Sequence, residues 1–106
     1  MIRKAFLIQA KPGMTGEYQK RHNPIWPEMK DVLKKYGVSN YSIFLHEETD
    51  SLFGYLEIED EDIFRRIGEE EVCRRWWKYM KEVLVSESDE SHMAKEVILK
   101  EVFHLD

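Results

Sequence analysis

Apolar side chains recur along this chain in short alternating runs, which indicate β-strands, and between these runs at the spacing of an α-helix. The first run ends at Lys11-Pro12-Gly13, which is a turn signal. Glu48-Thr49-Asp50-Ser51 is a second turn, and it is short enough to join the second and third runs as a hairpin. The predicted strands cover residues 2–10, 39–47, 52–59 and 97–105.

The first helical stretch runs from Gly16 to Tyr36, where apolar and aromatic residues recur at spacings of three and four. Thr15 is the predicted N-cap of this stretch. Pro24 and Pro27 interrupt it, because each removes a backbone donor and crowds the preceding turn. We therefore expect a kink or a break near residues 22–27.

The second helical region lies between the third and fourth strands. A short helix is predicted through Arg66, with Asp60 and Asp62 as candidate caps. A longer helix is predicted from Glu69 to about Leu84, because its apolar residues fall on one broad face and its basic residues on the rest. The polar stretch Ser86 to Ser91 is predicted to be a mobile loop.

The order strand, helix, strand, strand, helix, strand is that of the split βαβ, or ferredoxin-like, pattern. It predicts an α+β fold in which an antiparallel four-stranded sheet carries helices on one face. With 106 residues the chain is expected to form a single domain, residues 1–106, around one core. The other face of the sheet is left open, and since a second copy commonly covers such a face, we expect a homodimer.

The charge balance excludes several classes of partner. Lys and Arg number 16 against 21 Asp and Glu, whereas nucleic-acid binders carry a basic face and anionic membranes attract basic proteins. We therefore expect no nucleic-acid and no membrane partner. Cys73 is the single cysteine, which is compatible with the reducing cytoplasm, and the apolar run at the N-terminus is too short for a signal peptide.

Tyr18 and His22 form the first candidate site. The two side chains are one helical turn apart and project from the same face, next to the predicted break. One interpretation is structural: Tyr18 covers the edge of the core and His22 bonds to a nearby carbonyl. The other interpretation is that the break opens a concavity in which an imidazole, with an ordinary pKa near ~6.5, can exchange protons.

Trp76-Trp77 is the second candidate site. Neighbours on a helix project about 100° apart, so one indole can anchor the core while the other reaches a cleft. A purely structural role for both is equally compatible with the pattern, because tryptophans are large core residues. The abundance of Trp and Tyr favours flat, partly apolar ligands such as sugar rings, whose C–H faces stack on indole.

Motifs for cofactors and metals are missing from the sequence. Gly13-Met-Thr-Gly16 lacks the ending and the spacing of a phosphate-binding loop, and no His and Cys spacing resembles a zinc site. Cys73 lies on an apolar helix face, so we interpret it as a small core residue rather than a nucleophile. No cofactor and no metal site is therefore predicted.

Two long blocks of the chain closely resemble the L-rhamnose mutarotase family, and the likeness extends over nearly the whole chain. The blocks are Tyr18-x-x-Arg21-His22-Asn23-Pro24-Ile25-Trp26-Pro27-Glu28 and Cys73-x-Arg75-Trp76-Trp77-Lys78-Tyr79-Met80. Shorter matches are Arg3-Lys-Ala-Phe, the strand with Tyr41, and Glu101-Val102-Phe103.

The resemblance implies a cofactor-free isomerase of the aldose 1-epimerase type that interconverts the α and β anomers of L-rhamnose. It also implies a ferredoxin-like homodimer that pairs through its sheets as a dimeric α/β barrel. The family's proton donor falls on His22, and its sugar-binding positions fall on Tyr18, Tyr41, Trp76 and Trp77. Opening and closing the sugar ring needs general acid–base catalysis, which imidazole can supply. The group that partners His22 is open between a carboxylate, a tyrosine and water.

Two other classes of function use a similar aromatic pocket. A cofactor-independent ferredoxin-like monooxygenase would take a phenolic or polycyclic substrate and consume oxygen. A non-catalytic sugar-binding module would bind L-rhamnose without changing its rate of anomer exchange.

Overall fold

The computed structural model describes residues 1–86, 88 and 94–106 of the chain. In chain order the elements are β1 (Ile2–Gln9), α1 (Thr15–Arg21), α2 (Pro27–Lys35), β2 (Val38–His46), β3 (Ser51–Ile58), α3 (Glu61–Arg65), the 3-10 helix η1 (Arg66–Glu69), α4 (Glu71–Met80) and β4 (Val97–Leu99). The strands form one antiparallel sheet in the order β2-β3-β1-β4. The predicted α+β, ferredoxin-like fold is therefore confirmed.

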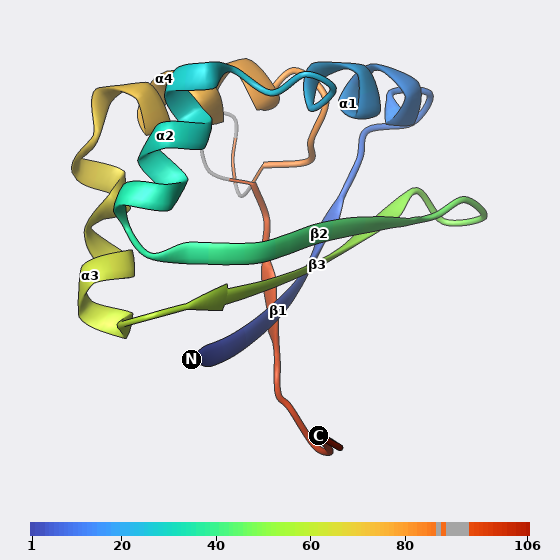
Figure 1. Cartoon of the computed structure of the whole chain (residues 1–106). Coiled ribbons are helices and arrows are strands. Elements are labelled where there is room, and N and C mark those ends of the chain that lie inside the picture. The colour runs from blue at the N-terminus through green and yellow to red at the C-terminus, as the bar shows by residue number, and fades with distance from the viewer. Residues whose placement is uncertain (87, 89–93) are drawn as a thin grey trace.

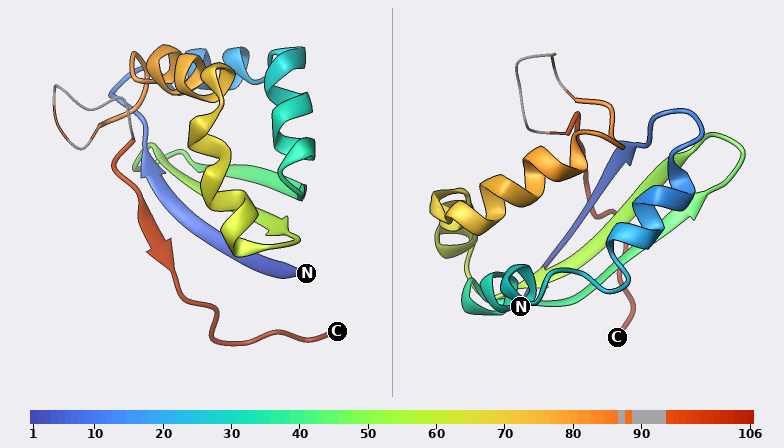
Figure 2. Two further views of the ribbon diagram at one scale, coloured as in Figure 1. Left: turned by 90° about the vertical axis from the view of Figure 1, so that its left-hand side faces the viewer. Right: turned by 90° about the horizontal axis from the view of Figure 1, so that it is seen from above.

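Helices α1, α2 and α4 lie together over one face of the sheet (Figure 1), and the side view in Figure 2 shows the same two layers. In the described part of the chain no helix covers the opposite face, and the segment after β4 leads away from the body of the molecule (Figure 1). Within these same residues, no helix has the length and apolar character needed to cross a bilayer.

Alternate residues of β1 and β3 point toward the helices and form the floor of the core. Phe6, Ile8, Leu52, Leu56 and Ile58 are each at most 8% exposed. Burial of one such side chain contributes about 1.5–3 kcal/mol, so this layer supplies a large share of the stability. The helices cover it with buried side chains of their own, which include Tyr18, Met29, Val32, Cys73, Trp76 and Met80.

Gly54 of β3 makes room for the ring of Phe6. The two residues are partners in the β1–β3 register, and a Cβ added to Gly54 would lie 2.1 Å from Phe6 Cζ. The tip of the Phe6 ring therefore occupies the space that a side chain at Gly54 would need. From there the ring meets Tyr41 of β2 edge to face, with 6.2 Å between the ring centroids.

The predicted break near residues 22–27 is confirmed, because α1 ends at Arg21 and α2 begins at Pro27. Proline is tolerated at the first position of a helix, where its missing N–H would have no partner. The predicted N-cap, Thr15, is wrong. Met14 holds the cap position instead, because its carbonyl already accepts the first helical hydrogen bond from Tyr18, and no side chain of the described residues caps this end of the helix.

The helix predicted from Glu69 to Leu84 is shorter in the structure, where α4 covers only Glu71–Met80. Its start is delayed because η1 occupies the residues before it. Its end comes early because the chain beyond Met80 turns to the end of β1, where the amide of Lys11 donates to the carbonyl of Val83 at 2.9 Å.

The strand predicted at residues 97–105 is also shorter, because only Val97–Leu99 has a neighbour, at Ala5–Leu7 of β1. Alternation describes the side chains, but a strand needs hydrogen-bond partners, and the chain after Leu99 leaves the sheet. Its contact with β1 continues through the ion pair of Arg3 with Glu101, at 2.8 Å. The predicted mobile loop Ser86–Ser91 lies outside the described residues, except for Ser86 and Ser88.

Candidate active site

His22 lies where α1 ends, and its imidazole is hydrogen-bonded to its own helix. The His22 amide donates to the carbonyl of Gln19 at 3.2 Å, which leaves the carbonyl of Tyr18 free for the His22 ring, 3.1 Å from Nδ1. A carbonyl can only accept, so Nδ1 carries the hydrogen. In the neutral ring the lone pair is therefore on Nε2.

The surroundings of His22 favour its neutral form. Burial lowers the pKa of His22, and the hydrogen bond to the Tyr18 carbonyl opposes this only in part. At neutral pH the ring is thus uncharged, and Nε2 can take up a proton as a base.

Aromatic rings enclose His22 on two sides. Tyr18 lies 4.5 Å away between centroids, with the planes 34° apart, and Trp76 of α4 meets the imidazole edge to face at 5.1 Å. Tyr18 is 6% and Trp76 is 7% exposed. Tyr18 belongs to the core and His22 bonds a carbonyl, as the structural interpretation of this pair expects, and the functional interpretation stays a prediction.

Tyr41 reaches the same region from the sheet. Although the residue is 40% exposed, burial raises the pKa of the Tyr41 phenol, and the charge of Glu96 adds to this effect. Burial also raises the pKa of Tyr18, with a further contribution from Tyr41. The two phenols are therefore close enough to sense each other, and both stay protonated at neutral pH.

Three polar atoms of this group have no hydrogen-bond partner among the residues that the structure describes. Within residues 1–86, 88 and 94–106, Tyr18 Oη, Tyr41 Oη and His22 Nε2 make no hydrogen bond. Two donors and one acceptor are thus free for the hydroxyls of a ligand.

Trp77 is not brought to this group. Its ring lies against η1, where a Cβ added to Gly68 would be 3.2 Å from Trp77 Cη2, and it lines a small hollow with Met80 and Leu84. Successive residues on α4 project about 100° apart, so Trp76 points to His22 and Trp77 away from it. A role for Trp77 in sugar binding stays a prediction.

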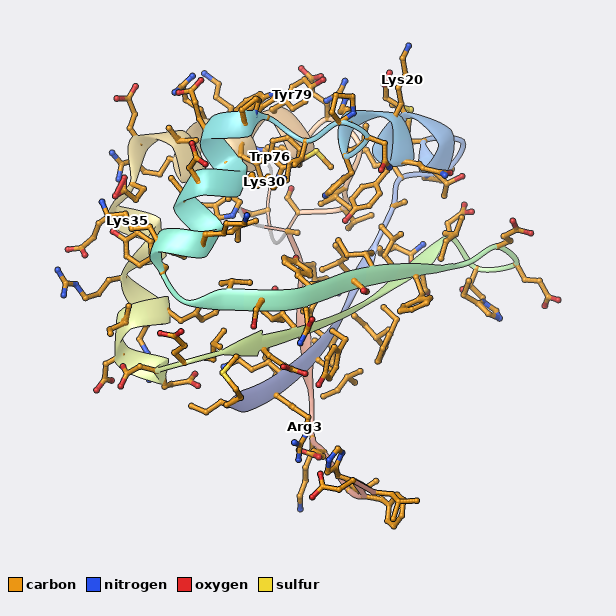
Figure 3. The ribbon with its side chains drawn as sticks, in the orientation of Figure 1. Arg3, Lys20, Lys30, Lys35, Trp76 and Tyr79 are labelled. Atoms are coloured by element: carbon orange, nitrogen blue, oxygen red, sulfur yellow. The ribbon has the colours of Figure 1, made fainter. Side chains whose placement is uncertain are left out.

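Two further rings belong to the site although the residue-by-residue reasoning did not single them out. Trp26 meets Trp76 edge to face at 5.0 Å, and Tyr79 lies 5.8 Å from Trp76. Figure 3 shows Trp76 and Tyr79 together in the helical layer. The three-residue spacing of Trp76 and Tyr79 on a predicted helix was the available signal, since such residues share a face. We call Tyr18, His22, Trp26, Trp76 and Tyr79 the aromatic cluster.

Cys73 is confirmed as a core residue. It is 1% exposed, and burial raises its pKa to about 11, so the thiol stays protonated. In the described part of the chain, no three His, Cys, Asp or Glu side chains converge in a way that could hold a metal ion. The expectation of a cofactor-free site stays a prediction.

Comparisons with known proteins show which family the chain resembles. The model of the L-rhamnose mutarotase family matches residues 3–105. The L-rhamnose mutarotase of Opitutus terrae is 52% identical over 106 residues, which are 100% of both chains. The crystal structure of an L-rhamnose mutarotase from Formosa agariphila is 31% identical, with a TM-score of 0.88 and 100% of both chains covered.

A more distant likeness concerns the fold alone. A dimeric ferredoxin-like protein from an uncultured marine organism is 11% identical, with a TM-score of 0.56, and the match covers 97% of this chain and 96% of that one. The family match is of another kind, because it combines high identity with full coverage. On this evidence the chain belongs to the L-rhamnose mutarotase family.

Proposed function

We propose that this protein is an isomerase of the aldose 1-epimerase type, which interconverts the α and β anomers of L-rhamnose. The observation that carries the proposal is a neutral imidazole near two phenols, where Nε2 and both hydroxyls have no hydrogen-bond partner among the described residues, in a chain of this family. The activity named for its relatives needs only proton transfers, and this site offers groups for them.

In the proposed reaction His22 carries one proton between two oxygens. Nε2 takes the proton of the anomeric hydroxyl, the C1–O1 bond becomes a carbonyl, and the ring bond from C1 to O5 breaks. O5 leaves with the bonding electrons and receives the proton from the imidazolium. After rotation about C1–C2 the steps reverse on the other face of the carbonyl. Both oxygens are bonded to C1, so one nitrogen can serve both.

Tyr18, Tyr41 and Trp76 bind the sugar in this proposal. Because the raised pKa values keep both phenols protonated, they donate hydrogen bonds to sugar oxygens and do not act as bases. Trp76 presents an apolar ring to the C–H groups or the methyl group of the sugar. His22 is thereby left as the proton-transferring group, and water or a carboxylate remain as its candidate partner.

Polarimetry on freshly dissolved crystalline α-L-rhamnose tests the proposed activity. The optical rotation is expected to reach its equilibrium value faster with increasing protein concentration, and the equilibrium value itself should not change. A non-catalytic sugar-binding module would leave the rate at the value of buffer alone. Oxygen uptake with a phenolic substrate, without any effect on the sugar, would favour the monooxygenase class.

The exchange rate is expected to fall in acid, as His22 gains the proton that removes its lone pair. Burial lowers the pKa of His22, so the fall is centred below the ordinary value of about 6.5. Since the unfolded chain binds this proton at higher pH than the folded protein, the free energy of unfolding also decreases as the pH drops below about 6.5. Rate profiles and denaturation from pH 4 to 8 measure both effects, and a rate that rises toward acid would contradict the role of His22 as base.

We further propose a homodimer that pairs through the open sheet face. Phe44, Phe53 and Val97 are 62%, 39% and 53% exposed on β2, β3 and β4. A depression of about 330 Å³ lies between this face and residues 99–104. These exposed side chains lie on neighbouring strands of one face, and a contiguous apolar patch of this kind is typical of an interface.

The substitution Phe44→Glu is expected to turn the dimer into a monomer, because it places a charge in the apolar contact. Ile63→Glu is the matched control, since Ile63 is 47% exposed on α3 but lies outside the sheet face. Light scattering during gel filtration gives the mass of each variant. A monomeric wild-type protein, or equal masses for the two variants, would contradict this interface.

We also propose that the chain forms one domain and that the protein is located in the cytoplasm. All described elements share a single sheet and a single core, which supports one domain over residues 1–106. The location is supported by the single cysteine, which is buried and reduced.

A further inference from the structure

The segment that carries His22 has little regular structure of its own. His22 follows the last residue of a seven-residue helix, and the chain then passes through a cis Asn23–Pro24 bond before α2 begins. Hydrogen bonds within α1 orient the imidazole on its helix, but they do not fix α1 relative to α4, which supplies Trp76. A contact between these elements must therefore determine where His22 lies in the site.

Arg21 makes such a contact directly before His22. Its Nη1 donates to the backbone carbonyl of Tyr79 at 2.7 Å, and its guanidinium carbon lies 4.0 Å from the centroid of the Tyr79 ring. Nη2 donates to Glu82 at 2.9 Å, and the Arg21 side chain is only 12% exposed. A shielded guanidinium that both stacks on a ring and bonds the last turn of a helix holds that helix end firmly.

Trp26 makes the matching contact after His22. Its indole stacks on Tyr79 with the centroids 5.1 Å apart and the planes at 28°. Tyr79 also lies 5.8 Å from Trp76, which meets the imidazole of His22. Arg21 and Trp26, on the two sides of His22, thus both contact Tyr79 of α4. Tyr79 also packs on Trp76, the neighbouring ring of the site.

We propose that Tyr79, held between Arg21 and Trp26, is a positioning residue that fixes His22 in the geometry needed for proton transfer. This inference rests on the proposed function. Tyr79 acts through its ring and its backbone carbonyl, because its phenol hydroxyl makes no hydrogen bond to the described residues. It does not need to touch the sugar: moving Tyr79 displaces both ends of the segment that carries the imidazole.

The substitution Tyr79→Leu tests the proposal, since it removes the ring and leaves the backbone carbonyl. We expect kcat for anomer exchange to decrease about 10- to 100-fold with a smaller change in KM, because misplacing a catalytic group by ~1 Å can cost ~100-fold. The edge-to-face contact of the His22 ring with Trp76 should be disturbed, which changes the ¹H and ¹⁵N chemical shifts of the His22 ring. Tyr79→Phe keeps the ring and is expected to restore kcat and the wild-type chemical shifts of the His22 ring. Tyr36→Leu makes the same change at the end of α2, where Tyr36 bonds Glu70, and serves as the control.

Arg21→Met provides a second variant in case Tyr79→Leu does not fold. It removes the guanidinium from the Tyr79 ring and should lower kcat and alter the His22 resonances in the same direction. Its control is Arg65→Met, because the Arg65 side chain is 71% exposed and its ion pair with Asp62 is long, at 3.7 Å.

Two results would overturn the positioning role. One is a kcat for the folded variants equal to that of their controls. The other is a lowered kcat with unchanged His22 resonances, since that would show damage elsewhere in the site. If the wild-type protein does not accelerate exchange at all, the proposed function fails, whereas the His22 resonances of the variants still decide whether Tyr79 positions the ring.

Discussion

Replacement of His22 by alanine is expected to slow protein-catalysed exchange of the L-rhamnose anomers by roughly 10²–10⁴-fold, the usual worth of one general acid–base group. The imidazole contributes the Nε2 lone pair, and the neighbouring phenols cannot replace it because burial raises their pKa values. The fold should persist, because among the described residues the His22 side chain is hydrogen-bonded only to the carbonyl of Tyr18 in its own helix. Sugar binding should also persist, since Tyr18, Tyr41 and Trp76 remain.

Saturation transfer between the two anomeric protons measures this effect at equilibrium. His46→Ala is the matched control, because His46 is exposed at the end of β2 and bonds Thr49 in the turn beyond it. Its hydrogen bond is not to a residue of the aromatic cluster. Circular dichroism of both variants checks the fold. Transfer rates that are the same for His22→Ala and His46→Ala would remove His22 from the reaction.

Gly54→Ala is expected to destabilise the protein by about 3 kcal/mol, at the upper end for overpacking of a core. The added Cβ would lie 2.1 Å from Phe6 Cζ, and Phe6 is itself 8% exposed in the core, so the ring has little room to yield. Displacing Phe6 also moves its edge-to-face partner Tyr41, so sugar binding should weaken together with stability.

Gly16→Ala is the control for this substitution. A Cβ at Gly16 meets no atom within 4 Å, and the residue lies in α1, where alanine favours the helix by about 0.5–1 kcal/mol. Urea denaturation of the two variants measures the difference. A Gly54→Ala variant as stable as Gly16→Ala would show that Phe6 does not depend on this glycine.

Local rules recover the fold well where the elements follow local chemistry. Three features follow from the residue types at their own positions: the hairpin turn, the break between the helices at the prolines, and the cap at Asp60. The Asp60 side chain accepts a hydrogen bond from the amide of Ile63 at 2.9 Å. Rules of this kind fail beyond Met80 and Leu99, because there the partners lie far away in the chain. Where α4 and β4 end depends on contacts with β1 and the residues after it, and the periodicity of the sequence contains no information about those contacts.

The same distinction applies to the candidate site: contacts between residues close in the chain could be predicted, and contacts between distant residues could not. Tyr18 and His22 are one helical turn apart, so their pairing can be predicted. The place of Tyr41 in the site could be predicted only from the family likeness, because Tyr41 lies on a strand, β2, and not on the helix that carries Tyr18. The choice between Trp76 and Trp77 needed the orientation of α4. Tyr79 contacts both ends of the His22 segment, at Arg21, 58 positions before it, and at Trp26, 53 positions before it, and no local pattern predicts these contacts.

The most direct test of anomer exchange by this protein is magnetisation transfer in an equilibrated solution of L-rhamnose. Saturation of the H1 resonance of the α anomer is expected to reduce the β resonance at a rate that rises in proportion to the wild-type protein concentration, with no new species formed. A transfer rate that stays at the value of buffer alone at every protein concentration would contradict the proposed function.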